Sequence, residues 1–204
     1  MPKSPTKRRP ATVAALTGSA LTLFAERGFH ATSISDIVQR AGLTRGAFYS
    51  NFRDKEELFL ALYDAHTDRL LAELRHQVES FTNDADPVAR VFDLLATHDA
   101  QERSWFLVSM EFTLHAARHP EVARALAEHE ERLNAGLAEV LDHCLASSGH
   151  TTDISSTALA RLVVALYEGL TAMRVTHPTA ETDPTPLARR ALPHLVRALG
   201  TPQN

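Results

Sequence analysis

The stretch TRGAFYSNFRDKEEL, which begins at Thr44, gathers basic, hydroxyl and aromatic side chains into a span too short to fold alone. Arg45 can donate two hydrogen bonds to the O6 and N7 edge of a guanine, and Gly46 lets a backbone approach closely. Thr44 and Ser50 can bond a base or a phosphate. Tyr49 can give its hydroxyl to a phosphate or its ring to a thymine methyl. Together these side chains predict contact with the groove and backbone of a nucleic acid.

Capping residues and glycines around this stretch predict two short helices joined by a tight turn. Ser33 and Asp36 have the spacing of a capping box at the start of one helix, which is expected to end at Gly42. Thr44 can cap the next helix. This is the helix-turn-helix arrangement, whose second helix is presented to the major groove. A longer helix is expected before it, over residues 11–28, ending at a glycine suited to the left-handed C-cap.

Two phenylalanines set the expected orientation of the second short helix. Phe48 and Phe52 are four residues apart, so they share one helix face, which we expect to pack on the core. The side chains of Arg45, Tyr49 and their neighbours must then point largely outward. After them, a long helix is expected over about residues 55–80.

Charge is divided unevenly along the chain. Residues 1–55 hold nine Lys or Arg and three Asp or Glu, a formal charge of +6, whereas residues 56–204 carry −10. A basic segment on an acidic remainder favours a small module that meets a polyanion. A solvated basic tail is the alternative, because four of these charges lie within residues 1–10.

The segment GFHATSISDIVQRAGLTRGAFYSNFRDKEELFLAL, with the preceding ALTLFAERG, resembles the DNA-binding domain of TetR-type (tetracycline-repressor-like) transcriptional regulators. The resemblance runs without gaps through about residues 11–60. Its elements are Arg27-Gly28, Ala31-Thr32-Ser33, Asp36-Ile37, Ala41-Gly42-Leu43, Tyr49, Phe52 and Lys55-Glu56. Many relatives have a histidine where this chain has Asn51, so we rank Asn51 below Tyr49 and Lys55 as a phosphate contact.

The resemblance implies an all-α, two-part subunit that dimerises and binds a palindromic operator in double-stranded DNA, usually as a repressor released by a small ligand. We expect a basic flexible arm at 1–10, a helix-turn-helix domain at 11–55, and a ligand-binding and dimerisation domain at 56–204. An activator of the same fold, or a non-regulatory small-molecule-binding or enzymatic helical protein, is the alternative. The residues predicted to contact DNA are Thr32, Ser33, Thr44, Arg45, Gly46, Tyr49, Ser50, Asn51 and Lys55.

Two C-terminal segments carry apolar stripes that can form a dimer interface. Residues 157–175 and 186–199 repeat apolar side chains at spacings of three and four. Two such helices from each subunit can pair as a four-helix bundle, which would place two reading helices about 34–36 Å apart on successive major grooves. Packing on the subunit's own core is the alternative. The predicted interface residues are Leu159, Leu162, Val163, Leu166, Leu170, Met173, Leu187, Ala191, Leu195 and Leu199.

The segment SWFLVSMEFTLHAARH is apolar on nearly all sides, so it is expected to be buried. It also contains Glu111 and His115, and buried polar groups need partners. Small-molecule sites are usually apolar cavities with a few polar groups, so this helix is a candidate for the ligand site. The candidate ligand contacts are Trp105, Phe106, Met110, Phe112, His115 and Tyr167, although core packing explains the aromatic residues equally well. The acidic body favours a small, largely apolar ligand that is neutral or cationic.

Other chemistry has little support in the sequence. Glu111, His115 and His119 have metal-ligand spacing on a helix, but eleven histidines make such spacing common by chance, and we predict no metal site. A phosphate-cradling glycine-rich loop, a dinucleotide fingerprint and a nucleophile elbow are all missing from the sequence, so we predict no catalytic residue and no cofactor. The lone Cys144 is expected in the core. Without a long apolar run or an apolar leader, the expected location is the cytoplasm, with no membrane partner.

Overall fold

The structure is a computed structural model of the chain. It describes residues 10–79, 100–147, 150–152, 154–176, 183, 186, 190–191, 194 and 200–202. The described residues fall into two compact units, each presented by itself below. The first unit comprises Met1–His66 and Ser104–His129, and the second comprises Thr67–Arg103 and Glu130–Asn204. The first unit thus joins a segment from the middle of the chain to the N-terminal helices.

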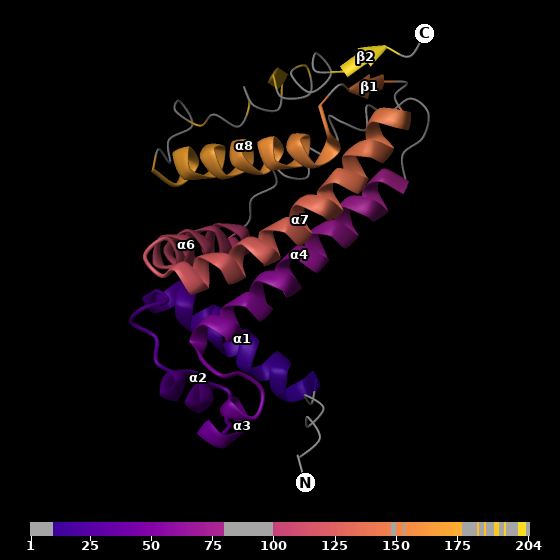
Figure 1. The fold of residues 1–204 in the computed structure, drawn as a ribbon. Helices are drawn as coiled ribbons and strands as arrows, with labels where there is room; N and C mark the ends of the chain where they lie inside the picture. Colours follow the sequence, from indigo (N-terminus) through magenta and orange to yellow (C-terminus); the bar gives the residue numbers. More distant parts are fainter. Residues whose placement is uncertain are drawn as a thin grey trace. The chain divides into compact units, whose positions relative to one another are not determined.

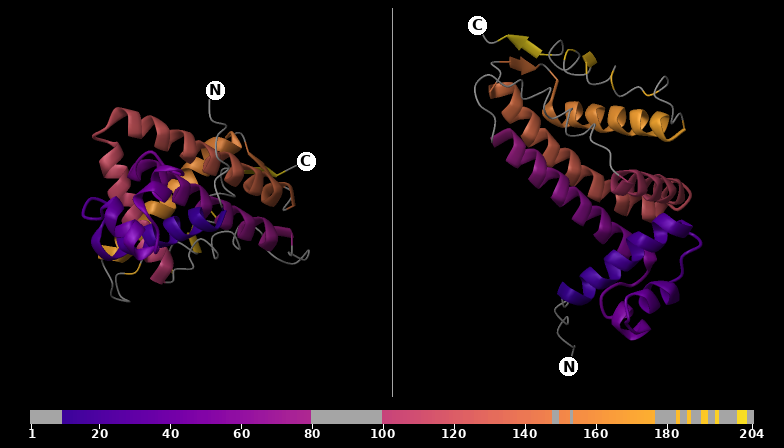
Figure 2. Two further views of the ribbon diagram at one scale, coloured as in Figure 1. Left: turned by 90° about the horizontal axis from the view of Figure 1, so that it is seen from below. Right: turned by 180° about the vertical axis from the view of Figure 1, so that it is seen from behind.

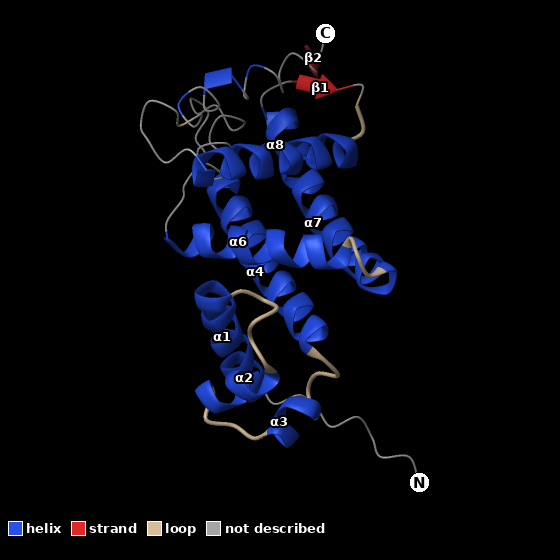
Figure 3. Ribbon diagram, turned by 90° about the vertical axis from the view of Figure 1, so that its left-hand side faces the viewer, coloured by secondary structure: helices blue, strands red, loops and turns tan. Residues whose placement is uncertain are grey.

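Helices dominate the described part of the chain, in agreement with the all-α prediction (Figures 1 and 3). Their bounds are α1 Pro10–Arg27, α2 Ile34–Arg40, α3 Arg45–Tyr49, α4 Lys55–Glu79, α6 Ala100–Ala116, α7 Pro120–Ser147 and α8 Ser156–Thr176. Most of the expected helix at 186–199 lies outside the described residues. A short antiparallel strand pair, β1 His150–Thr152 and β2 Gly200–Pro202, was not predicted.

The caps around α2 and α3 form as the sequence predicts. The Ser33 hydroxyl accepts a hydrogen bond from the Asp36 amide, and the Asp36 carboxylate accepts one from the Ser33 amide. The Thr44 hydroxyl accepts from the Ala47 amide at 3.1 Å. The glycines at the ends of α1 and α2 have positive φ, 85° at Gly28 and 64° at Gly42, which a residue with a Cβ adopts at a cost.

One hydrophobic core holds the first unit together. Its large buried side chains come from α1, α2, α3, α4 and α6, and α1–α3 lie together in both views of Figure 2. The most deeply buried are Leu16, Phe24, Phe29, Ile37, Phe48, Phe52, Leu58, Phe59 and Phe112. Burying each such side chain contributes about 1.5–3 kcal/mol. The short helices α2 and α3 are therefore held by tertiary packing, since helices of seven and five residues are unstable alone.

A separate core in the second unit joins the later part of α4, the later part of α7, and α8. Cys144 is buried in this core as predicted. A Cβ added to Gly136 would clash with Leu71, so the α4 and α7 backbones approach closely at this point. Arg75 on α4 also pairs with Glu139 on α7 at 3.0 Å.

Among the helices that the structure describes, none combines the length and apolar character required to cross a bilayer.

Candidate nucleic-acid interface

The outward face of α3 carries the side chains predicted to read DNA. Phe48 and Phe52 are 0% and 1% exposed, so the inward face of α3 is fixed in the core. Arg45, Tyr49 and Ser50 are exposed, with Tyr49 at 53%. The predicted orientation of α3 is therefore confirmed, and Thr44 and Gly46 are exposed on the same short helix. Contact of this face with DNA remains a prediction.

Arg45 differs from the other arginines near it. Arg27, Arg40 and Arg53 each lie within 3.8 Å of a carboxylate oxygen. In the described range 10–55, Arg45 is the arginine for which the structure shows no acidic partner. Its five N–H donors are thus not committed within the chain, and they suit bidentate contact with a guanine edge or a phosphate.

Two predicted phosphate contacts, Thr32 and Lys55, have structural roles within the chain. The Thr32 side chain is 1% exposed, and its hydroxyl donates to the carbonyl oxygens of Gly28 at 2.8 Å and Leu23 at 3.2 Å. The Lys55 ammonium donates to the carbonyl oxygens of Phe29 at 2.5 Å and Thr32 at 2.7 Å. The polar groups of Thr32 and Lys55 thus hold the turn between α1 and α2, and contact of these two residues with DNA stays a prediction.

The environment of Lys55 is consistent with this structural role. Burial lowers the pKa of the Lys55 ammonium, with Glu56 and Glu111 opposing that shift. The ammonium also lies 4.4 Å from the centre of the Phe29 ring, in cation–π geometry.

Among the predicted phosphate contacts, Ser33 is exposed at the N-cap of α2, where it forms the capping box with Asp36.

The side chain of Asn51, which follows the C-cap of α3, is turned back onto that helix. Its side-chain amide donates to the Ala47 carbonyl oxygen at 2.8 Å, and its amide oxygen is buried without a hydrogen-bond partner in the described structure. One of the two N–H donors of the Asn51 side chain is therefore used within the chain, whereas Tyr49 is 53% exposed.

Replacing Lys55 by methionine is expected to lower the free energy of unfolding by about 1–3 kcal/mol, because two carbonyl groups lose a charged donor. Urea unfolding followed by circular dichroism measures this change. Arg53→Gln is the matched control, since Arg53 is 84% exposed and its removal takes away the same charge. That control should cost less than about 1 kcal/mol. Equal, small effects of both substitutions would contradict the structural role of Lys55.

Three of the predicted ligand contacts on α6 are packed in the first core. The Trp105 ring stacks on the rings of Phe59 and His66, with distances between ring centres of 5.9 Å and 4.2 Å. The Phe112 ring stacks on Phe59 at 3.8 Å. His115 is 8% exposed and contacts Phe112 at 5.9 Å. Trp105, Phe112 and His115 therefore pack in the core, which is the alternative to a ligand site. Met110 is half-buried, and Phe106 lies outside this cluster of rings.

Glu111 on α6 has the backbone partners that its burial requires, whereas neither ring nitrogen of the buried His115 makes a hydrogen bond in the described structure. The Glu111 carboxylate accepts hydrogen bonds from the backbone amides of Phe29 and His30. His115 Nε2 lies 3.2 Å from Glu56 Oε1. Glu111 is therefore directed at the backbone rather than toward His119, and the described residues contain no group of three side chains suited to a metal ion.

Burial lowers the pKa of His115, and the nearby His119 and His30 add to this shift while Glu56 opposes it. A histidine whose pKa is lower in the folded state loses stabilising free energy as the pH falls through its unfolded value of about 6.5. We expect the wild-type protein to lose more stability between pH 7.5 and 5.5 than His115→Phe, which keeps the aromatic contacts. Unfolding free energies across this range test the prediction, and identical pH slopes would refute it.

The sixth ligand candidate, Tyr167, belongs to the second unit. It packs on the core there, and burial raises the pKa of Tyr167 to about 12, with a further contribution from Glu102. The phenol is therefore neutral at physiological pH.

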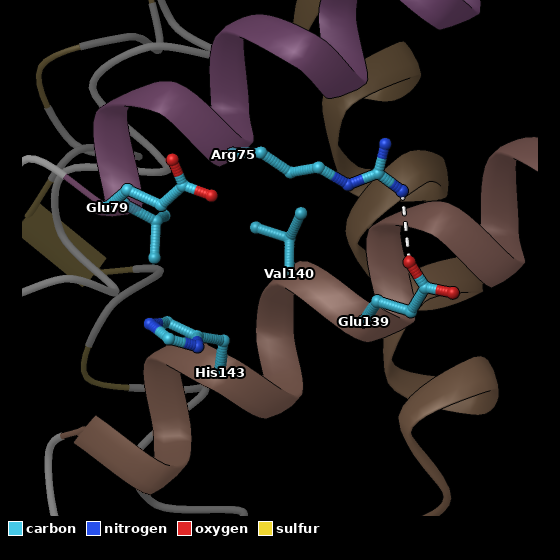
Figure 4. Close-up of a pocket in the computed structure, with 6 residues that line it drawn as sticks. Arg75, Glu79, Glu139, Val140 and His143 are labelled. Atoms are coloured by element: carbon cyan, nitrogen blue, oxygen red, sulfur yellow. Dashed lines mark hydrogen bonds and ion pairs between the residues drawn. The ribbon is translucent and has the colours of Figure 1, made fainter.

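A small pocket of about 160 Å³ lies between α4 and α7 in the second unit (Figure 4). Its lining is Arg75, Val78, Glu79, Glu139, Val140 and His143, and it includes none of the predicted ligand contacts. The Arg75 and Glu139 side chains pair with each other there (Figure 4). Pockets for drug-sized ligands are usually about 300–1,000 Å³ and mostly apolar, so this smaller pocket, in which charged side chains outnumber the two valines, does not match the expected ligand site.

The predicted interface residues on α8 separate into two faces. Leu159 and Val163 are each 1% exposed and pack in the core of the second unit, which is the alternative to a dimer interface. Leu166 and Leu170 are partly buried against the same core. Leu162 and Met173 are 45% and 50% exposed on the other face. Ala191 is described as partly buried, whereas Leu187, Leu195 and Leu199 lie outside the described residues.

The exposed face of α8 contains small residues that the sequence analysis missed. Ala158, Leu162, Ala165, Gly169 and Ala172 repeat at spacings of four and three, and all are exposed. This period of 3.5 is typical of a helix that packs along a partner helix. A Cβ added to Gly169 would meet no atom within 4 Å, so the surface is open at this point. Larger leucines on the buried face obscured this signal in the sequence.

Comparison with protein families gives two matches that together span most of the chain. Residues 16–62 match the family described as bacterial regulatory proteins, tetR family. Residues 84–200 match the family described as BetI-type transcriptional repressor, C-terminal.

Individual relatives include a transcriptional repressor and a transcriptional activator. The chain is 26% identical over 149 residues to the HTH-type transcriptional repressor Rv1474c of Mycobacterium tuberculosis, covering 73% of this chain and 74% of that protein. It is 32% identical over 87 residues to the HTH-type transcriptional activator FasR of Mycolicibacterium smegmatis, covering 41% of this chain and only 39% of that protein. The crystal structure of a TetR-family regulator from Rhodococcus sp. has a TM-score of 0.77 at 18% identity, covering 93% and 100% of the two chains.

Proposed function

We propose that this chain, which belongs to the TetR family of transcriptional regulators, is a dimeric repressor that binds a palindromic operator through α3 and is released by a small ligand. The observation that carries the proposal is the exposed pair Arg45 and Tyr49 on a helix fixed by the buried Phe48 and Phe52. A rigid helix with uncommitted polar side chains is what base recognition needs. No enzymatic activity is part of the proposal.

Repression is favoured over activation by the extent of the similarity. The family described as a repressor C-terminal domain matches residues 84–200, and the repressor Rv1474c matches most of the chain. The match to an activator covers less than half of this chain. Operator position relative to a promoter finally decides the direction of regulation, so activation by the same fold is the second candidate.

Selection of bound duplexes from random DNA tests DNA recognition directly. The expected result is a palindromic consensus whose half-sites are about 10 base pairs apart from centre to centre, or a multiple of that spacing. Absence of any enriched sequence would refute the proposal. Repeating the binding with candidate ligands identifies the compounds that release the operator.

Alanine substitution of Arg45 or Tyr49 is expected to weaken binding to the selected duplex by roughly 5- to 150-fold, the loss of about 1–3 kcal/mol typical of a base contact. Fluorescence anisotropy at fixed salt measures the Kd. Arg124→Ala removes an exposed arginine from α7 and should change the Kd little. Unaltered affinity in both α3 variants would remove α3 from the interface.

The exposed face of α8 supports dimerisation. Its small residues allow two helices to approach closely, and Leu162 and Met173 add apolar area along the same face. We propose that this face, rather than Leu159 and Val163, packs on its equivalent in a second copy. A dimer matches the two-fold symmetry of a palindromic operator.

Leu162→Glu is expected to raise the dimer dissociation constant by at least about tenfold, because an unpaired carboxylate would be buried in the interface. Analytical ultracentrifugation measures this constant. Leu114→Glu is the matched control, since Leu114 is an equally apolar residue that is 59% exposed on α6. If Leu162→Glu dimerises as tightly as the control, the interface lies elsewhere.

The ligand is proposed to be small, largely apolar, and neutral or cationic. Phe106 and Met110 lie one turn apart on α6 and are the proposed contacts within the first unit. Tyr167, whose phenol is neutral, is a separate candidate within the second unit. The formal charge of −10 over residues 56–204 disfavours an anionic ligand.

A further inference from the structure

Glu111 on α6 contacts the turn that leads into the proposed reading helices. Its Oε2 accepts a hydrogen bond from the Phe29 amide at 2.7 Å, and its Oε1 accepts one from the His30 amide at 3.2 Å. Both amides follow Gly28, which has φ of 85°. Successive amides that point at one anion form a concave binding site for it. The carboxylate therefore fixes both peptide groups of this turn.

A larger residue at position 28 would displace the Glu111 carboxylate from this contact. A Cβ added to Gly28 would lie 2.9 Å from Glu111 Oε2 and 3.0 Å from Oε1. Gly28 thus serves two requirements, the positive φ that ends α1 and the close approach of the Glu111 carboxylate. The close approach involves a distant part of the chain, because Glu111 lies 82 positions after Phe29, whose amide it binds.

The same turn is held from its other side by α4. Phe29 donates its amide to Glu111, and its carbonyl oxygen accepts from the Lys55 ammonium. The Lys55 ammonium also binds the carbonyl oxygen of Thr32, which immediately precedes Ser33, the N-cap of α2. The path from α1 to α2 is therefore held between one charged group on α6 and another on α4.

Two further side chains on the same face of α6 strengthen the attachment. Residues 111, 112 and 115 lie on one side of the helix. The Phe112 ring contacts Phe29 at 5.1 Å in edge-to-face geometry, and His115 Nε2 lies 3.2 Å from Glu56 on α4. The later half of α6 is thus part of the packing that supports α2 and α3.

We propose that Glu111 is a positioning residue for DNA recognition, because its carboxylate fixes the turn at residues 28–30 and thereby the direction in which α2 and α3 present their outer face. The inference rests on the proposed function, in which α3 reads the operator. Glu111 itself does not touch DNA in this account. It acts through the backbone of Phe29 and His30.

The test uses the full chain with Glu111→Ala, Glu111→Gln and the control Glu121→Gln, which removes one exposed carboxylate from the first turn of α7. Nuclear magnetic resonance measures hydrogen exchange at the Phe29 and His30 amides. Anisotropy measures the Kd for the duplex selected from random DNA and for a scrambled duplex. Loss of a negative charge alone would tighten binding to both duplexes, so the ratio of the two constants reports positioning.

We expect Glu111→Ala to speed exchange at both amides at least tenfold and to lower the ratio of specific to scrambled affinity at least fivefold. Both measurements for Glu111→Gln should lie between those of the wild-type protein and Glu111→Ala, because glutamine keeps one acceptor oxygen and the same shape. Exchange at amides in the second core should be unchanged, which excludes general unfolding. Glu121→Gln should match the wild-type protein in amide exchange and in the ratio of specific to scrambled affinity.

Unchanged exchange at Phe29 and His30 would overturn the inference, as would faster exchange with undiminished selectivity. A wild-type protein that prefers no duplex would instead overturn the proposed function. The two failures are distinguishable, because the first requires a selective wild-type protein and the second shows no selectivity at all.

Discussion

The packing around the Phe29 ring is the interaction on which the rest of the first unit depends. This ring lies 5.2 Å from Phe24 on α1, 6.1 Å from Phe59 on α4 and 5.1 Å from Phe112 on α6. Its own peptide is held by charged groups on α4 and α6. Since α2 and α3 are too short to be stable alone, their orientation is inherited from these longer helices. A reading surface for DNA requires such rigidity, because base contacts have strict geometry.

The structure also explains why the outer face of α3 is the candidate for recognition. Many polar groups near it are already used within the chain: the Thr32 hydroxyl, the Lys55 ammonium and the Asn51 amide all bind carbonyl oxygens. Arg45 and Tyr49 remain exposed. Groups that satisfy the backbone maintain the fold, and uncommitted groups are available to a partner. Hydrogen-bond geometry thus separates the groups used within the chain from the groups that are not. The second set is smaller than the set of DNA-contact candidates that residue types alone suggested.

Local features were predictable from the sequence, and distant contacts were not. The caps at Ser33 and Thr44 depend on neighbours three residues away, so their spacing was sufficient. The sequence marked Glu111 as a buried group that needs a partner, but the partner lies 82 residues away and is a backbone amide, which no side-chain pattern encodes. On α8 both helix faces are apolar, so periodicity did not separate the core residue Leu159 from the exposed Leu162. The TetR-type resemblance supplied the family but no ligand identity.

Dimethyl sulfate footprinting of the selected duplex tests the central claim that α3 reads bases in the major groove, because this reagent methylates guanine N7 there. The account predicts protected guanines in two clusters, about 10 base pairs apart or a multiple of that spacing, with protection lost in Arg45→Ala. Uniform guanine reactivity on a duplex that the protein binds selectively would contradict it, as would protection confined to adenine N3 in the minor groove.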